Sequence, residues 1–113
     1  MTKNKVVLVS FPFDDLSTNK VRTAVCLTDP IGPYRHVVLA FITSHISDTP
    51  LETDVLLDST HSDFSATGLH VSSMLQVHRL LTVSTSMIRR RLGELPLGYQ
   101  EQVADKVLKL FAL

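Results

Sequence analysis

The chain has 113 residues, with 11 basic and 11 acidic side chains and a formal net charge of zero. A chain of this length normally forms one domain with a modest core, so we expect residues 1–113 to fold as a single unit. A neutral chain is not a simple polycation that coats nucleic acid, and a single cysteine cannot form an intrachain disulfide.

Targeting and membrane signals are not found in this sequence. Residues 1–5 lead straight into a strand-like run rather than a signal peptide, and no apolar segment approaches the roughly 20 residues that span a bilayer. We therefore expect a cytoplasmic protein without membrane contact. The charges are uneven, since residues 1–63 carry five basic and eight acidic side chains, and residues 64–113 carry six and three. An anionic partner is thus expected to contact the C-terminal half.

The first predicted element is a hairpin within residues 5–28. Apolar, β-favouring residues form the run 6–9, residues 11–13 close that strand, and the polar residues 14–19 have the composition of a turn. The apolar run resumes at residues 21–27, and Arg22 is the charge that interrupts it. A charge inside a buried strand needs a partner or a site to face. Arg22 therefore either reaches solvent, pairs with an aspartate of the turn, or faces a functional site.

Further strands are predicted from short apolar runs between turn-forming residues. They cover residues 36–43, 53–57, 70–75 and 78–83, the last two being separate strands or one kinked strand. Residues 64–68 are predicted to form a turn in which Gly68 takes a positive φ. A helical turn at 84–88 and a short strand at 90–95 are expected to follow. The connections are too short for parallel crossovers, so antiparallel pairing is favoured.

The last element is an amphipathic helix over residues 98–113. Its apolar residues recur at three- and four-residue spacing, at Tyr99, Val103, Val107 and Leu110. Strands that are apolar at every position need cover on both faces. We therefore predict a mainly β fold, a small antiparallel SH3-like barrel capped by this helix, and a homodimer that covers the remaining apolar surface.

Common catalytic signatures are not found in the sequence. It contains no cysteine pair, no two histidines at metal-ligand spacing on one face and no glycine-rich phosphate loop, so neither a metal nor another cofactor is expected. Cys26 lies in an apolar run and is interpreted as a buried, inert thiol. The residues that remain are Arg22 and the pair Thr43–Ser44, although Thr43 could simply be a β-branched residue that ends a strand.

The segment 6–28, VVLVSFPFDDLSTNKVRTAVCLT, resembles the first hairpin of the MazF/PemK toxin family. That hairpin often reads V-x-V-x-F-P-F-x-D-x-x-x-x-K-x-R-P-A-x-V-x, and the family's Arg-Pro is Arg22-Thr23 here. The resemblance continues through residues 41–44, 64–69, 80–82 and 88–95, so it covers nearly the whole chain. It implies a PemK-type barrel and a metal-independent endoribonuclease that cuts mRNA at selected sequences.

The resemblance also implies site residues. The family's active-site arginine and threonine correspond to Arg22 and Thr43 in this sequence. In the implied reaction the 2′-hydroxyl of the RNA attacks the neighbouring phosphate, which gives a 2′,3′-cyclic phosphate and a 5′-hydroxyl. A guanidinium is a bidentate donor for the developing negative charge, and a hydroxyl adds a neutral donor. The group that accepts the 2′-hydroxyl proton is left open, with His45 as one candidate.

Single-stranded RNA is expected to contact several more residues, namely Lys20, Ser44, His45, Gln76 and Arg79. The run 89–91 is three consecutive arginines, which either follow an RNA backbone or form a solvated face. The implied protein partner is a small antitoxin that blocks the site. Two alternatives stay open: a non-catalytic or gyrase-poison-like relative that binds a protein, for which Thr23 is the supporting feature, and a small barrel that binds RNA without cutting it.

Overall fold

The computed structural model describes residues 1–12 and 19–113 of the chain, so the predicted turn with Asp14 and Asp15 lies outside the described residues. The described elements, in chain order, are β1 (Lys5–Pro12), β2 (Asn19–Cys26), β3 (His36–Thr43), β4 (Asp54–Leu57), the 3-10 turn η1 (Phe64–Thr67), β5 (Ser73–Ser84), the 3-10 turn η2 (Thr85–Met87), β6 (Ile88–Glu94) and α1 (Leu97–Leu110).

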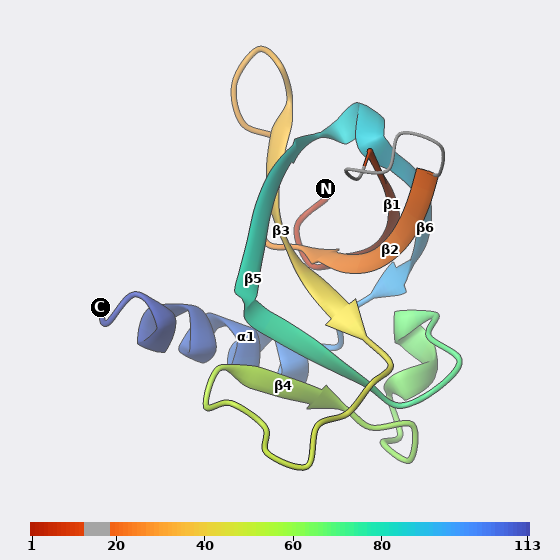
Figure 1. Ribbon diagram of the computed structural model, residues 1–113, viewed down its shortest axis with the longest axis vertical. Helices are drawn as coiled ribbons and strands as arrows, with labels where there is room; N and C mark the ends of the chain where they lie inside the picture. Colours follow the sequence, from red (N-terminus) through yellow and green to blue (C-terminus); the bar gives the residue numbers. More distant parts are fainter. Residues whose placement is uncertain (13–18) are drawn as a thin grey trace.

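The strands form one antiparallel sheet in the order β4-β5-β3-β2-β1-β6. Figure 1 shows that this sheet curls strongly, with α1 lying across its lower part beside β4 and β5. The predicted mainly β fold with antiparallel strands and a C-terminal helix is confirmed. The hydrogen-bonded ladder does not close into a complete barrel, because β4 and β6 are its two edge strands.

The core forms two clusters because successive side chains of a strand alternate between the two faces of the sheet. One cluster joins the sheet to α1 and includes Leu57, Leu75, Leu95, Tyr99 and Val103. The other lies on the opposite face of these strands and includes Val7, Val9, Cys26, Leu39 and Val83. Burial raises the pKa of the Cys26 thiol to about 11, which agrees with the prediction of an inert thiol.

Several element boundaries follow the sequence pattern closely. β3 covers the predicted residues 36–43, and Gly68 has the predicted positive φ of 73°. The two predicted short strands are one kinked strand, β5, which begins only at Ser73. The helix ends at Leu110, earlier than predicted, because Phe111 leaves helical geometry, with φ −94° and ψ 2°, and Ala112 adopts a left-handed φ of 57°. Across the described residues, no helix is long and apolar enough to cross a membrane.

Candidate functional site

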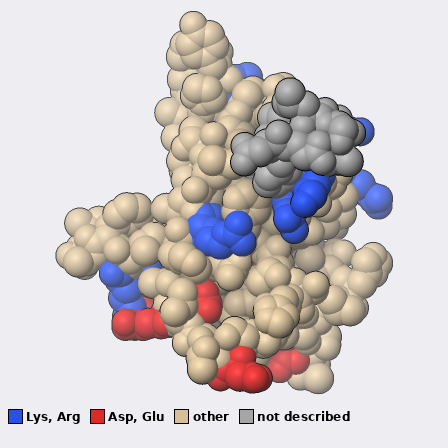
Figure 2. Space-filling view, viewed as in Figure 1, with Lys and Arg blue, Asp and Glu red and all other residues tan. Residues whose placement is uncertain are grey.

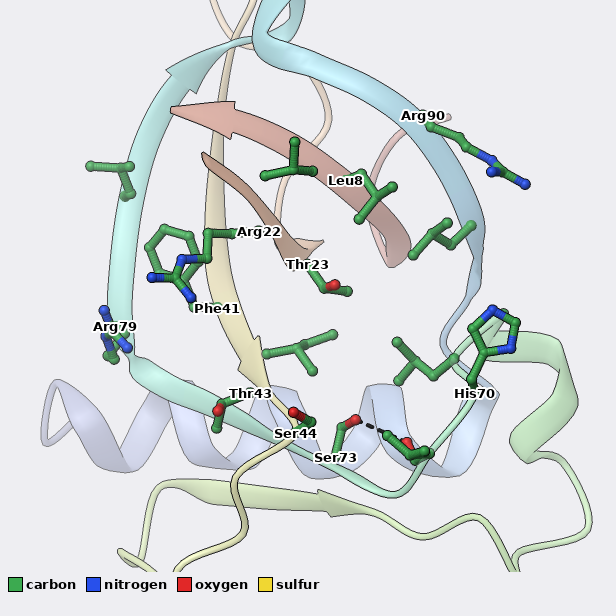
Figure 3. A pocket seen from close by; sticks show the side chains of 17 residues that line it. Leu8, Arg22, Thr23, Phe41, Thr43, Ser44, His70, Ser73, Arg79 and Arg90 are labelled. Carbon is green, nitrogen blue, oxygen red and sulfur yellow. Dashed lines mark hydrogen bonds between the residues drawn. The ribbon is translucent and has the colours of Figure 1, made fainter. Parts of the chain in front are cut away.

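A pocket of about 640 Å³ opens where β2 and β3 separate. The ladder between these strands has three pairs, Ala24–Phe41, Val25–Ala40 and Cys26–Leu39, and then ends. Beyond it, the pocket is lined by side chains from β1, β2, β3, β5 and β6 and from residues 68–71. Figure 3 shows β5 along one side of this space and β6 along the other.

Arg22 and Thr43 lie on the two strands that border the opening. Each residue is two positions beyond the last paired residue of its strand, Ala24 or Phe41, and therefore points to the same side of the strand as that residue. Both side chains line the pocket, as Figure 3 shows. The structure thus brings together two side chains that are 21 positions apart in the sequence.

Arg79 reaches the pocket because β5 carries extra residues at this point. Ala40 pairs with Leu80, whereas the next residue, Phe41, pairs with Gln76, so residues 77–79 have no partners on β3. The Arg79 guanidinium carbon lies 5.3 Å from the centre of the Phe41 ring. Its Nη1 donates to Oε1 of Gln76 over 3.3 Å. A cation–π contact and a side-chain hydrogen bond therefore hold Arg79 at the wall.

The Thr43 hydroxyl is oriented by the chain that follows it. The backbone N–H of His45 donates to Oγ1 of Thr43 over 3.1 Å, which occupies an acceptor position of the hydroxyl and leaves its proton available to donate. Ser44 lies beside Thr43 and also lines the pocket. His45 therefore contributes a backbone contact to the site.

The structure does not bring every expected residue into the pocket lining. Arg22, Thr43, Ser44 and Arg79 line it, whereas the side chains of Lys20, His45 and Gln76 do not. Gln76 accepts a hydrogen bond from Arg79. Lys20 is an exposed residue of β2, in register with Phe11 of β1.

Four polar residues of the lining were not among the expected site residues, namely Thr23, His70, Ser73 and Arg90. His70 and Arg90 are both exposed and lie at the end of the pocket away from Arg79 (Figure 3). The arginine run 89–91 contained a signal for Arg90, because alternate strand residues face opposite sides. Arg90 lines the pocket, whereas Arg89 and Arg91 do not. No local pattern singled out His70.

Charge is unevenly placed around this region. Figure 2 shows basic side chains in the middle of the molecule, near the end of β2 and the kink of β5, and acidic side chains along the lower edge, over β4 and α1. Among the residues that the structure describes, Arg22, Arg79 and Arg90 line the pocket and no acidic side chain does. Such a pocket attracts an anionic ligand. Within residues 1–12 and 19–113, no three His, Cys, Asp or Glu side chains form a group that could hold a metal ion.

Comparison with known proteins agrees with this architecture. The family model of the "PemK-like, MazF-like toxin of type II toxin-antitoxin system" matches residues 2–111. No protein with a curated function matches the chain at a significant level.

Three solved structures illustrate the match to this fold. The Mycobacterium tuberculosis toxin MazF-mt6 superposes with a TM-score of 0.71 at 20% identity, covering 96% of this chain and 97% of that one. A mycobacterial endoribonuclease in complex with its cognate antitoxin gives a TM-score of 0.72 at 11% identity, with 100% and 96% covered. The MazE–MazF complex of Deinococcus radiodurans gives 0.71 at 17% identity, with 100% and 97% covered. At these identities the likeness establishes the fold.

Proposed function

The chain belongs to the PemK-like, MazF-like toxin family of type II toxin–antitoxin systems, and from this premise we propose that it is a metal-independent endoribonuclease that cuts single-stranded mRNA at selected sequences. The observation that carries the proposal is that Arg22 and Thr43 line one pocket, together with further cations and hydroxyls. This is the combination that stabilises negative charge on a reacting phosphate.

In the proposed reaction, the 2′-hydroxyl oxygen attacks the adjacent phosphorus and the bond from phosphorus to the 5′-oxygen breaks. The products are a 2′,3′-cyclic phosphate and a 5′-hydroxyl. Arg22 offers two parallel N–H donors to the phosphorane oxygens and stays protonated throughout, so its main role is charge stabilisation. The Thr43 hydroxyl donates a hydrogen bond to a phosphorane oxygen. Its own oxygen already accepts the N–H of His45, which leaves the hydroxyl hydrogen free to donate.

The remaining expected contacts divide into two groups. Ser44 and Arg79 line the pocket and are proposed to bind the RNA phosphates beside the cleaved bond. Gln76 is proposed to act through Arg79, to which it is hydrogen-bonded. Lys20 and His45 lie outside the lining, and we propose that they contact RNA where it leaves the pocket.

We further propose a homodimer in the cytoplasm that is inhibited by a small antitoxin. Three apolar side chains of α1 and its C-terminus support self-association, because Leu97, Leu108 and Phe111 are all exposed. An antitoxin is supported by the family and by the two solved complexes of similar toxins with antitoxins. Its acidic segment would be attracted to the same basic pocket as RNA.

The test is cleavage of a defined RNA in EDTA by the parent protein and four variants. Arg22→Ala and Thr43→Val should cut at least about a hundredfold more slowly, as when a donor to a transition-state oxyanion is removed. Arg22→Lys should recover only part of the rate, because an ammonium keeps the charge but not the bidentate geometry. Thr82→Val removes a hydroxyl from an exposed residue of β5 outside the pocket lining and should cut at the parental rate.

Several outcomes would contradict the proposal. Parental cutting by a folded Arg22→Ala protein would remove Arg22 from the mechanism. Intact RNA combined with a growth defect would favour the protein-binding relative, to which Thr23 in place of the family's proline points. RNA retained on a filter without cleavage would instead indicate a barrel that only binds RNA.

A further inference from the structure

The pocket is larger than a single phosphate group requires. Its volume of about 640 Å³ is within the range of roughly 300–1,000 Å³ that is typical of small-molecule sites. The proposed function assigns roles to Arg22, Thr43, Ser44 and Arg79 of the pocket lining. The opposite end is lined by His70 and Arg90, which Figure 3 shows across the space from Arg79. The proposed cleavage chemistry gives this second end no role.

Residues 66–70 form the wall of the pocket that carries His70. This wall contacts β6, the strand that carries Arg90. A Cβ placed on Gly68 would overlap the carbonyl of Leu92, and a Cβ placed on Gly93 would overlap the carbonyls of Ala66 and Thr67, so these backbones are in direct contact. The fully buried Thr67 donates to the Phe64 carbonyl over 2.7 Å and accepts from the Leu69 N–H over 3.2 Å. His70 and Arg90 therefore project from rigidly joined segments, as a specific binding site requires.

The side chains at this end suit a nucleotide. The pocket lining also contains apolar residues whose surfaces can cover the face of a base, among them Leu8, Leu92 and the two neighbours of His70 in the chain, Leu69 and Val71. A histidine ring can stack on a base or hydrogen-bond to its edge, and a guanidinium can bind phosphate or stack on a base plane. Within the described part of the chain, Arg90 forms no ion pair. It is therefore available to an anionic ligand.

We propose that His70 and Arg90 form a subsite for one RNA nucleotide next to the cleaved phosphate, and that this subsite determines which base is accepted there. The proposal rests on the proposed function, because the ligand is the RNA that Arg22 and Thr43 would cut. His70 stacks on or hydrogen-bonds to the base, and Arg90 binds the phosphate on the far side of that base. One end of the pocket thus cleaves the RNA, and the other end selects the base.

The experiment compares His70→Ala, Arg90→Ala and Arg89→Ala with the parent protein. Arg89 is the matched control, because it is an exposed arginine of the same strand that does not line the pocket. Cleavage sites are mapped on a long RNA of mixed sequence by sequencing its 5′-hydroxyl ends. KM and kcat are measured on one short RNA that contains a preferred site. Binding is measured by fluorescence anisotropy on the same RNA with a 2′-deoxy nucleotide at the cut.

If the subsite exists, His70→Ala and Arg90→Ala should each raise KM about tenfold and leave kcat within about threefold, as expected for the loss of one stacking or phosphate contact. Both should relax the base preference at the same single position beside the cut. Arg89→Ala should change KM less than about threefold and leave the preference intact, since it removes only an exposed charge outside the pocket lining.

The outcomes separate this inference from the proposed function. If the parent cuts RNA and both variants keep its KM and base preference, the subsite is wrong and the nuclease stands. If Arg89→Ala weakens binding as much as Arg90→Ala, the effect is general charge, and the subsite is again wrong. If the parent binds RNA without cutting it, and the His70 and Arg90 variants bind about tenfold more weakly, the nuclease is wrong and the subsite stands. If the parent neither cuts nor binds RNA, both are wrong.

Discussion

The region beneath α1 and the pocket are built from the same strands by different means. Beneath α1, β4 and β5 pair in continuous register, and buried apolar residues such as Val55, Leu57 and Leu75 face the helix. At the pocket, the β2–β3 ladder ends, β5 carries three residues without partners on β3, and β6 shifts register twice against β1. Regular pairing gives stability, whereas interrupted pairing releases side chains that can bind a ligand.

The comparison also shows how the irregular region can remain rigid. The pocket wall is held by backbone contacts at Gly68 and Gly93, and Leu69 of this wall and Leu92 of β6 are only partly buried against the core. The helix side is held by side-chain volume, since Leu75, Leu95 and Val103 are almost fully buried. A substitution beneath α1 should therefore lower stability without reshaping the pocket. A substitution in the pocket wall should reshape the pocket at a smaller cost in stability.

The largest expected loss of stability is from Leu75→Ala, beneath α1. Leu75 is fully buried, and truncating such a side chain typically lowers the free energy of unfolding by about 2–5 kcal/mol. The matched control is Leu56→Ala on the paired strand β4, because Leu56 is 44% exposed, and it should cost less than about 1 kcal/mol. Urea unfolding monitored by circular dichroism measures both. Equal losses in the two variants would mean that the core beneath α1 is not the main source of stability.

The next effect comes from the pocket wall and is tested by a glycine series. Gly68 and Gly32 both have a φ of 73°, but a Cβ meets the Leu92 carbonyl only at Gly68 and nothing within 4 Å at Gly32. Gly32→Ala should cost about 1 kcal/mol from the left-handed backbone alone. Gly68→Ala should cost about 1–3 kcal/mol more, because the wall must move away from β6.

The same series distinguishes the wall from general destabilisation. If the wall carries the nucleotide subsite, Gly68→Ala should also raise the KM for RNA, whereas Leu75→Ala should leave KM within about threefold when measured well below its melting temperature. Thermal unfolding and RNA cleavage on one set of samples provide both readouts. Equal losses from Gly68→Ala and Gly32→Ala would show that the contact with Leu92 is unimportant.

Much of the fold could be predicted from sequence because its signals are local. The unbroken apolar run of β3 and the helical spacing of Tyr99 and Val103 predict their elements, and short connections predict antiparallel pairing. The end of α1 was missed because it depends on the backbone of Phe111 and Ala112 rather than on hydrophobic spacing. The three residues of β5 without partners on β3 appear in the sequence only as an ambiguity between two short strands and one kinked strand.

The pocket was less predictable because it depends on contacts between distant residues. Arg22 stood out as a charge in an apolar strand, and family resemblance supplied Thr43. His70 gave no comparable signal and Arg90 gave only that of the arginine run 89–91, since their place in one pocket depends on the contact of the Gly68 and Gly93 backbones, 25 positions apart. The roles of Arg22 and Thr43 in cleavage remain predictions that the RNA experiments test.

The smallest expected effect concerns the edge of the sheet, where β1 holds β6 through Lys5 and Glu94. These residues are paired in register, and Nζ of Lys5 lies 2.8 Å from Oε1 of Glu94. The hydrogen bond from Lys5 and then the charge of Lys5 lower the pKa of Glu94. A carboxylate with a lowered folded pKa stabilises the protein above its unfolded pKa, and that stabilisation is lost as pH falls through the folded pKa.

Lys5→Met should therefore lower the free energy of unfolding near neutral pH only slightly, because Glu94 is half exposed and methionine keeps the buried apolar stem of Lys5. The difference between variant and parent should shrink as pH falls from about 7 to about 3.

The pH dependence of the unfolding free energy that remains in the variant should come from Asp29 and Asp58, whose pKa values are lowered by backbone N–H donors. Lys106→Met on α1 is the control and should leave a constant difference. If the Lys5→Met difference is equally constant with pH, this ion pair does not contribute to holding β6, which would then be held by its backbone pairing with β1 and its contact with Gly68.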